Sequence, residues 1–95
     1  MIQQTLLALS DPTRREILKM LKKGDKTAGE IAERFDISAP AISRHLSVLK
    51  DAELVVVQRE GKFLLYSLYC EPLESLDDWI NNFLNEDWWG KKNEK

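Results

Sequence analysis

The sequence predicts a mainly α-helical domain with one small β-hairpin, which is an α+β fold. Apolar residues recur at helical spacing in several segments, most clearly at Ile42, Leu46 and Leu49. Two β-rich segments flank Glu60 and Gly61, and a glycine at this place is typical of a hairpin turn. The 95 residues, of which 43% are hydrophobic and 32% charged, suit one globular domain with a modest core.

The first part of the chain predicts two helices, separated by a turn at Ser10–Thr13. A short apolar pattern in residues 2–9 predicts the first helix. Asp11 is a good N-cap for the second, and Pro12 suits its first helical position. The second helix ends in a basic turn followed by a glycine, which is typical of a helix C-terminus. Its predicted buried side consists of Ile17, Leu18, Met20 and Leu21.

Two further helices follow closely on one another, a pattern typical of a helix-turn-helix. Thr27 and Glu30 form a capping-box sequence at the start of the third helix, which is expected over residues 28–35. After a tight link, Ser38 can cap the fourth helix, with Pro40 in its first turn. The fourth helix has an apolar stripe on one side and small or cationic residues on the other. Such a helix can bury one side and present the start of the other to a DNA major groove.

The β-hairpin and a last helix that starts at Pro72 complete the order α-α-α-α-β-β-α, which is that of a winged helix-turn-helix. The tip of the hairpin carries Arg59 and Lys62, which are placed to reach phosphate groups. We expect one DNA-binding and dimerisation domain over residues 1–90 and a disordered tail over residues 91–95.

The first and last helices carry more large apolar residues than a domain of this size can bury. Exposed, these residues would form an unusually large apolar patch. Paired across a two-fold axis, they form a dimer interface, and the two recognition helices then lie about one DNA turn, roughly 34–36 Å, apart. The predicted interface residues are Ile2, Leu6, Leu9, Leu76, Trp79, Ile80, Phe83 and Trp88.

The charge distribution is compatible with DNA binding although the formal net charge is −2. Residues 1–62 hold 11 Lys and Arg against 9 Asp and Glu, whereas residues 63–95 hold 3 against 7. The acidic excess therefore lies in the last third of the chain, away from the fourth helix. We expect modest non-specific affinity for DNA and few specific contacts.

Nothing in the sequence predicts a membrane segment or a secreted protein. The longest apolar runs, such as residues 54–57, are too short to span a bilayer, and the first residues lack the pattern of a signal peptide. Cys70 is the only cysteine, so it cannot form an internal disulfide. A cytoplasmic protein is the simplest interpretation.

The candidate DNA contacts come from the fourth helix, its cap and the hairpin. Ser43 can bond a base or a phosphate, and Arg44 can bond guanine with two hydrogen bonds. His45 is the only histidine, so it predicts no enzyme; either a polar contact near DNA or packing within the domain explains it. Arg14 and Arg15 either reach DNA or pair within the chain. The full candidate set is Thr27, Ser38, Ala39, Pro40, Ser43, Arg44, His45, Lys50, Arg59 and Lys62.

Four segments together resemble one family, the ArsR-type winged-helix repressors of bacteria, and most of all its SdpR-type autorepressors. The segments are SDPTRREIL, TAGEIAERFDIS, APAISRHLSVLKDAELV and REGKFLLYSL. The resemblance implies a homodimeric transcriptional repressor that has its terminal helices at the interface and binds an inverted-repeat operator in double-stranded DNA. It also implies an inducer, and for the SdpR type this is a membrane protein or another protein that sequesters the repressor.

The sequence departs from the metal-sensing members of this family. Where those members carry thiolates on the third helix, this chain has Ala32 and Arg34, and its last helix has Asp77 and Asp78 but no histidine. Sensing of transition metals needs thiolate or imidazole donors, so we expect no metal and no cofactor. Two alternatives stay open: a repressor of this fold that responds to a metal or small ligand between the terminal helices, and a winged helix that binds only proteins.

Overall fold

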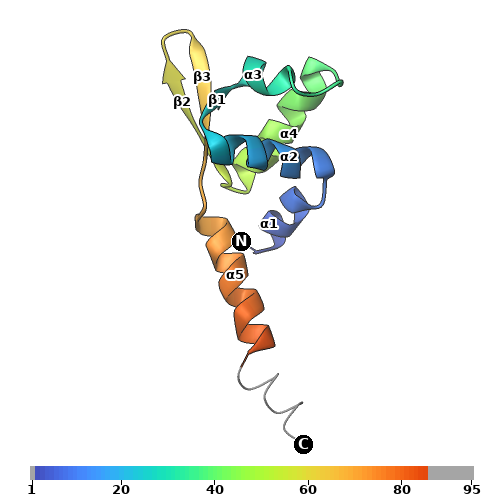
Figure 1. The fold of residues 1–95 in the computed structure, drawn as a ribbon, viewed down its shortest axis with the longest axis vertical. Helices are drawn as coiled ribbons and strands as arrows, with labels where there is room; N and C mark the ends of the chain where they lie inside the picture. The colour runs from blue at the N-terminus through green and yellow to red at the C-terminus, as the bar shows by residue number, and fades with distance from the viewer. Residues whose placement is uncertain (1, 86–95) are drawn as a thin grey trace, which may run out of the picture.

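The computed structural model describes residues 2–85 and has the predicted winged helix-turn-helix fold. In Figure 1 the helices before the hairpin form a body, the hairpin projects from one end of it, and the last helix extends from the other. The elements in chain order are α1 (Ile2–Leu9), α2 (Pro12–Lys23), β1 (Lys26–Thr27), α3 (Ala28–Ala32), α4 (Ala39–Asp51), β2 (Val55–Glu60), β3 (Phe63–Leu68) and α5 (Glu71–Leu84).

The sheet has three strands rather than the two of the predicted hairpin. Its order is β1-β3-β2, and both pairings are antiparallel. β1 is a strand of two residues that pairs Lys26 with Tyr66 and Thr27 with Leu65. So short a strand has no alternation to detect, and it exists only because β3 supplies its partner. The sequence analysis therefore missed it.

The predicted hairpin turn is confirmed. Glu60 pairs with Phe63 and encloses Gly61 and Lys62 in a two-residue turn. Gly61 has a φ of 62°, in the left-handed region where a side chain is strained. This turn places Lys62 at the outermost point of the hairpin.

The core lies between α2, α3, α4 and the start of β2. The predicted apolar stripes of α2 and α4 are confirmed, since all of their members are buried. α3 is shorter than predicted and ends at Ala32, so the link to α4 spans residues 33–38. Only Ile31 of its apolar residues is fully buried, while Phe35 packs against the core from the link.

The two terminal helices pack against each other, and α5 extends beyond that contact. Leu73 in the first turn of α5 packs against the core, but no residue of α5 is fully buried. None of the helices within residues 2–85 is long and apolar enough to cross a membrane. α5 therefore presents a long surface outside the core of its own chain.

Candidate nucleic-acid interface

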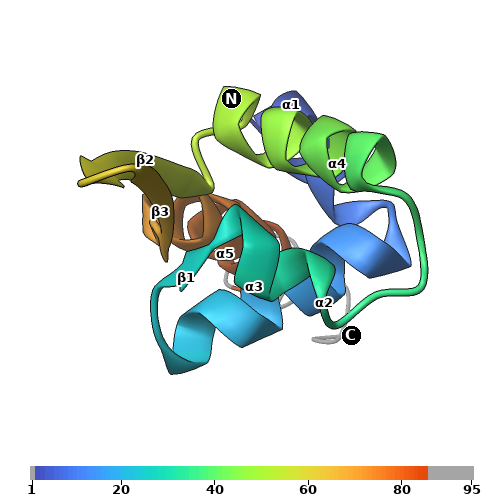
Figure 2. The same cartoon turned by 90° about the horizontal axis from the view of Figure 1, so that it is seen from above.

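α4 separates a buried face from an exposed one. Ser38 caps it, because its hydroxyl accepts a hydrogen bond from the Ala41 N–H at 3.2 Å. Figure 2 shows α4 along one edge of the helical body, with α2 and α3 on its inner side. The stripe that contains Leu46 faces inward, whereas Ser43 and Arg44 are exposed. Ser38, Ala39 and Pro40 are exposed as well, so the start of α4 is open to a partner.

The hairpin tip and the end of α4 add exposed cations. Lys62 is exposed in the turn, and Arg59 is exposed beside it, with its Nη1 donating to the Gly61 carbonyl at 3.5 Å. Lys50 is exposed in the last turn of α4. Next to Lys62 in the chain, the side chain of Phe63 is 58% exposed, a feature that the sequence analysis missed. The tip therefore combines positive charge with one aromatic side chain.

Thr27 has a structural role at the start of α3. Its hydroxyl accepts from the Glu30 N–H at 3.2 Å, and the Glu30 carboxylate accepts from the Thr27 N–H at 2.9 Å. This reciprocal pair is the predicted capping box. A contact of Thr27 with phosphate stays a prediction.

His45 lies at the corner between α1 and α2 rather than on the open face of α4. Its Nδ1 is 3.1 Å from Nη1 of Arg14 and 3.9 Å from a carboxylate oxygen of Asp11. Arg14 also donates to backbone carbonyls of α1, and Nη1 of Arg15 donates to the Leu9 carbonyl at 2.7 Å. Both arginines are thus engaged within the chain, through backbone carbonyls and, for Arg14, also through the ring of His45. A DNA contact of His45 stays a prediction.

Asp11 is the N-cap of α2, as predicted. Its carboxylate accepts from the N–H groups of Thr13 at 2.8 Å and Arg14 at 3.2 Å. Desolvation raises the pKa of Asp11, but these two hydrogen bonds and the nearby His45 and Arg14 outweigh it and bring the pKa below its ordinary value of 3.8. The charged carboxylate therefore stabilises this corner.

The lowered pKa of Asp11 predicts a pH-dependent contribution to stability. The contribution is complete above pH 3.8 and is lost as the pH falls toward the lower folded-state pKa. Asp11→Asn keeps a capping oxygen but has no titrating group. We expect the difference in free energy of unfolding between the wild type and this variant, measured by chemical denaturation, to shrink on acidification from about pH 6 to about pH 3. A difference that stays constant over this range would contradict the assignment.

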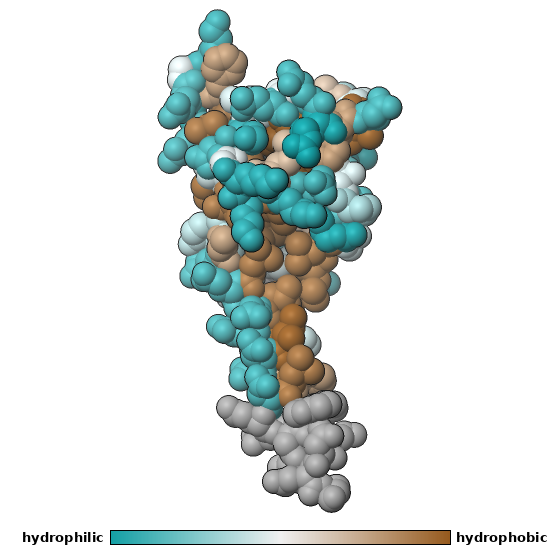
Figure 3. All heavy atoms as spheres, viewed as in Figure 1, coloured by the Kyte–Doolittle hydropathy of each residue, from teal (hydrophilic) through white to brown (hydrophobic). Residues whose placement is uncertain are grey.

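Large apolar side chains are exposed on both terminal helices. In Figure 3 they form a continuous brown stripe along α5. Trp79 and Phe83 are 52% and 51% exposed, and their rings stack with centroids 5.7 Å apart. On α1 the small residues Thr5 and Ala8 are buried, whereas Leu6 and Leu7 are exposed. We call this surface the terminal apolar face, and its exposed members are Leu6, Leu7, Trp79, Ile80, Phe83 and Leu84.

The predicted interface residues divide into three groups. Leu6, Trp79, Ile80 and Phe83 are exposed on this face, and Leu7 and Leu84, which the sequence analysis did not name, join them. Ile2, Leu9 and Leu76 are half-buried. Trp88 lies outside the described residues, as does the tail predicted over residues 91–95.

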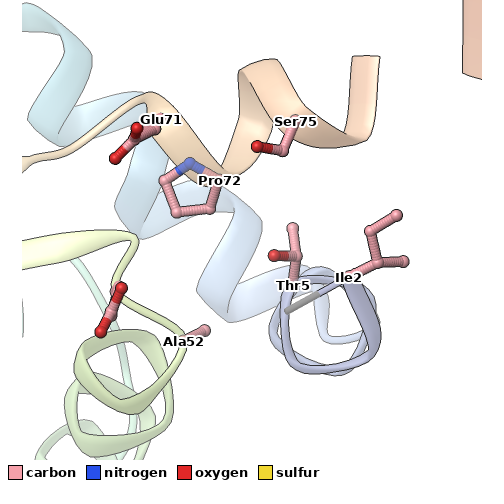
Figure 4. A pocket seen from close by; sticks show the side chains of 7 residues that line it. Ile2, Thr5, Ala52, Glu71, Pro72 and Ser75 are labelled. Atoms are coloured by element: carbon pink, nitrogen blue, oxygen red, sulfur yellow. The ribbon is translucent and has the colours of Figure 1, made fainter. Parts of the chain in front are cut away.

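A cavity of about 320 Å³ lies where α1, α5 and the end of α4 meet. Figure 4 shows Thr5 of α1 opposite Glu71, Pro72 and Ser75 of α5. Glu71 also accepts a hydrogen bond of 2.6 Å from the Tyr69 hydroxyl, and this bond raises the pKa of Tyr69. Within residues 2–85, no group of three or more His, Cys, Asp or Glu residues could hold a metal ion.

The exposed face of a helix-turn-helix, beside a hairpin with a basic tip, defines a winged-helix DNA-binding protein. Residues 11–57 match the family model described as "Bacterial regulatory protein, arsR family". The chain is 53% identical over 79 residues to the transcriptional repressor SdpR of Bacillus subtilis (strain 168). The aligned region covers 83% of this chain and 88% of that protein. It is also 40% identical over 80 residues to an arsenical resistance operon repressor of Staphylococcus xylosus, covering 84% of this chain and 73% of that protein.

A solved structure of an ArsR-like regulator has a similar fold. An ArsR-like transcriptional regulator from Rhodococcus sp. RHA1 superposes with a TM-score of 0.82 and is 30% identical, over 86% of this chain and 75% of that one. The chain belongs to the ArsR family of bacterial regulatory proteins, and the predicted resemblance is confirmed. It is a DNA-binding transcriptional repressor and not an enzyme.

Proposed function

We propose that this repressor acts as a homodimer on an inverted-repeat operator and blocks its promoter by occupying it. The division of α4 into a fully buried stripe and an open face at Ser38–Arg44 carries the proposal. A helix held in this way can enter a major groove with its first two turns, where Ser43 and Arg44 meet base edges. Acting on promoter DNA places the protein in the cytoplasm.

Dimerisation is supported by the terminal apolar face. Trp79, Ile80, Phe83 and Leu84 lie on the part of α5 beyond its contact with the core. An isologous pairing of α5 with α1 and α5 of a second chain removes these side chains from water. The pairing also presents two copies of α4 to one face of the DNA, so an operator with two-fold symmetry fits the dimer.

The proposed inducer is a protein, such as a membrane protein that sequesters the repressor, because the chain offers few donors for a metal. It has one histidine and one cysteine, and Nδ1 of that histidine already faces Arg14. The cavity between α1 and α5 gives a specific place for the alternative, a small ligand that acts from between the terminal helices. Titration of the protein with transition metals, followed by tryptophan fluorescence, tests the metal-responsive alternative, and we expect no saturable response.

The hairpin tip predicts a measurable salt effect. We expect Lys62→Ala to weaken specific and non-specific DNA binding alike, because a phosphate contact carries no sequence information. The slope of log K against log salt concentration should become shallower by about one unit. Lys19→Ala, which removes an exposed cation from α2, is the matched control and should leave the slope unchanged. If Lys62→Ala also left it unchanged, the hairpin tip would not contact DNA.

The proposed function is tested by binding to the DNA upstream of the protein's own gene. Fluorescence anisotropy at physiological ionic strength should show a complex that resists excess non-specific DNA and weakens steeply with salt. A protein-interaction module would give no such complex. The absence of any specific, salt-sensitive binding at this ionic strength would reject the DNA-binding proposal.

A further inference from the structure

We propose that Arg14 is a positioning residue that fixes the recognition helix α4 relative to the dimerisation helix α1, through its hydrogen bond to His45. The inference rests on the proposed function, in which α4 reads DNA and α1 contributes to the dimer. It assigns Arg14 a part in operator binding without a contact to DNA.

The guanidinium group of Arg14 joins two other helices at one point. Its Nε donates to the Ala8 carbonyl at 2.9 Å, and its Nη2 donates to the Leu7 carbonyl at 3.0 Å. Its third nitrogen, Nη1, lies 3.1 Å from Nδ1 of His45 on α4. Because the group is planar, the three directions are fixed relative to one another, and a rotation of α4 against α1 breaks at least one bond.

The pairing also indicates which ring nitrogen of His45 accepts a hydrogen bond. A guanidinium group only donates hydrogen bonds, so Nδ1 must accept, and the ring proton must be on Nε2. Asp11 and Arg14 are the charged groups that face this ring; the Asp11 carboxylate is 3.9 Å from Nδ1. The side chains of His45 and Asp11 are 19% and 32% exposed, so the corner is partly shielded from water. The acceptor Nδ1 of His45 therefore lies in a partly shielded corner, facing Arg14.

α1 depends on this corner for its carboxyl end. It has only eight residues and no basic residue in its last turn, and a helix of this length is marginal alone. The backbone carbonyls of Leu7, Ala8 and Leu9 accept hydrogen bonds from Arg14 and Arg15 of α2. α1 exposes Leu6 and Leu7 on the surface proposed to form the dimer, and α4 is the helix proposed to contact DNA. Arg14, which holds the carboxyl end of α1, therefore lies between the two.

Three substitutions isolate the hydrogen bond from charge and volume. Arg14→Lys keeps the positive charge that a direct phosphate contact would need but cannot reproduce the planar fork. His45→Asn places an amide oxygen at the position of Nδ1, whereas His45→Leu has nearly the same shape as asparagine and no acceptor. The two His45 variants leave the bonds from Arg14 to α1 in place, so the comparison stands even if Arg14→Lys does not fold.

The experiment measures DNA affinity, its salt slope and the dimer dissociation constant for these variants. The DNA is the upstream fragment that the wild type binds, together with the same fragment carrying one extra base pair between its half-sites. We expect His45→Leu and Arg14→Lys to bind the native spacing about tenfold more weakly, the effect of one charge-assisted hydrogen bond. The salt slope of both variants should be unchanged, and their discrimination against the altered spacing should fall. Dimerisation should be unchanged in His45→Leu, which keeps the bonds from Arg14 to α1. His45→Asn should bind within about threefold of the wild type.

Three outcomes would overturn the inference. Wild-type affinity in Arg14→Lys would mean that charge alone matters. Equal losses in His45→Asn and His45→Leu would mean that the acceptor has no role. Strictly additive losses in the double variant Arg14→Lys/His45→Leu would mean that the two residues act separately. If the wild type itself bound no upstream DNA, the proposed function would fail instead, so the two failures are distinguishable.

Discussion

Phe83→Asp separates the proposed dimer into single chains and abolishes specific DNA binding. Phe83 lies near the end of α5 with half of its surface exposed, in stacking contact with Trp79. In the dimer, a carboxylate at this position would be buried without a partner, which costs about 3 kcal/mol or more. This corresponds to a loss of roughly 100-fold or more in dimerisation. Sedimentation equilibrium measures the dissociation constant, and anisotropy measures the effect on DNA.

The matched control is Asn82→Asp, which introduces the same charge on the preceding residue of α5. Asn82 is exposed and polar and does not belong to the terminal apolar face. This variant should dimerise and bind DNA like the wild type. If Phe83→Asp still dimerised normally, or if both variants lost dimerisation equally, the interface would not lie on this face.

Arg44→Ala should weaken binding to the operator by about 1–3 kcal/mol and relax discrimination at one or two base pairs. Arg44 is exposed on the open face of α4, one residue after Ser43, where a guanidinium can form two hydrogen bonds with guanine. The effect on non-specific DNA should be much smaller than the effect on the operator. Affinities for a set of operators with single base-pair changes give the measurement.

Arg44→Lys serves as the comparison for this prediction. Lysine keeps the charge but lacks the fork that bonds one base twice. We expect it to restore non-specific affinity without restoring full discrimination. Equal weakening of specific and non-specific DNA by Arg44→Ala would make Arg44 a phosphate contact instead of a base contact.

The features that could be predicted from the sequence are those that depend on neighbouring residues. Asp11, Thr27 and Ser38 cap their helices as expected, because a cap involves only the next two or three residues. Gly61 marks the hairpin for the same local reason. The apolar stripes of α2 and α4 could also be predicted, since helical periodicity puts their apolar residues on one side.

The features that were missed depend on contacts between distant segments. β1 needs Leu65 and Tyr66, which lie nearly 40 residues later, and no local pattern marks it. The hydrogen bond between Arg14 and His45 spans 31 residues and could not be assigned from either neighbourhood. α1 buries the small residues Thr5 and Ala8 and exposes Leu6 and Leu7, and this choice of side depends on how α1 packs against the other helices.

The candidate DNA contacts follow the same division. The sequence identified α4, its cap and the hairpin tip, and the structure leaves Ser43, Arg44 and Lys62 exposed there. It could not decide between the alternatives for His45, because that choice depends on how α4 packs against the corner of α1 and α2. Which of these side chains contact DNA stays a prediction.

Hydroxyl-radical footprinting of the complex on upstream DNA tests the central proposal most directly. A homodimer that inserts two copies of α4 should protect two symmetric regions whose centres lie one helical turn, roughly 34–36 Å, apart, with flanking protection from the hairpins. A single protected region without two-fold symmetry would contradict the proposed dimeric repressor.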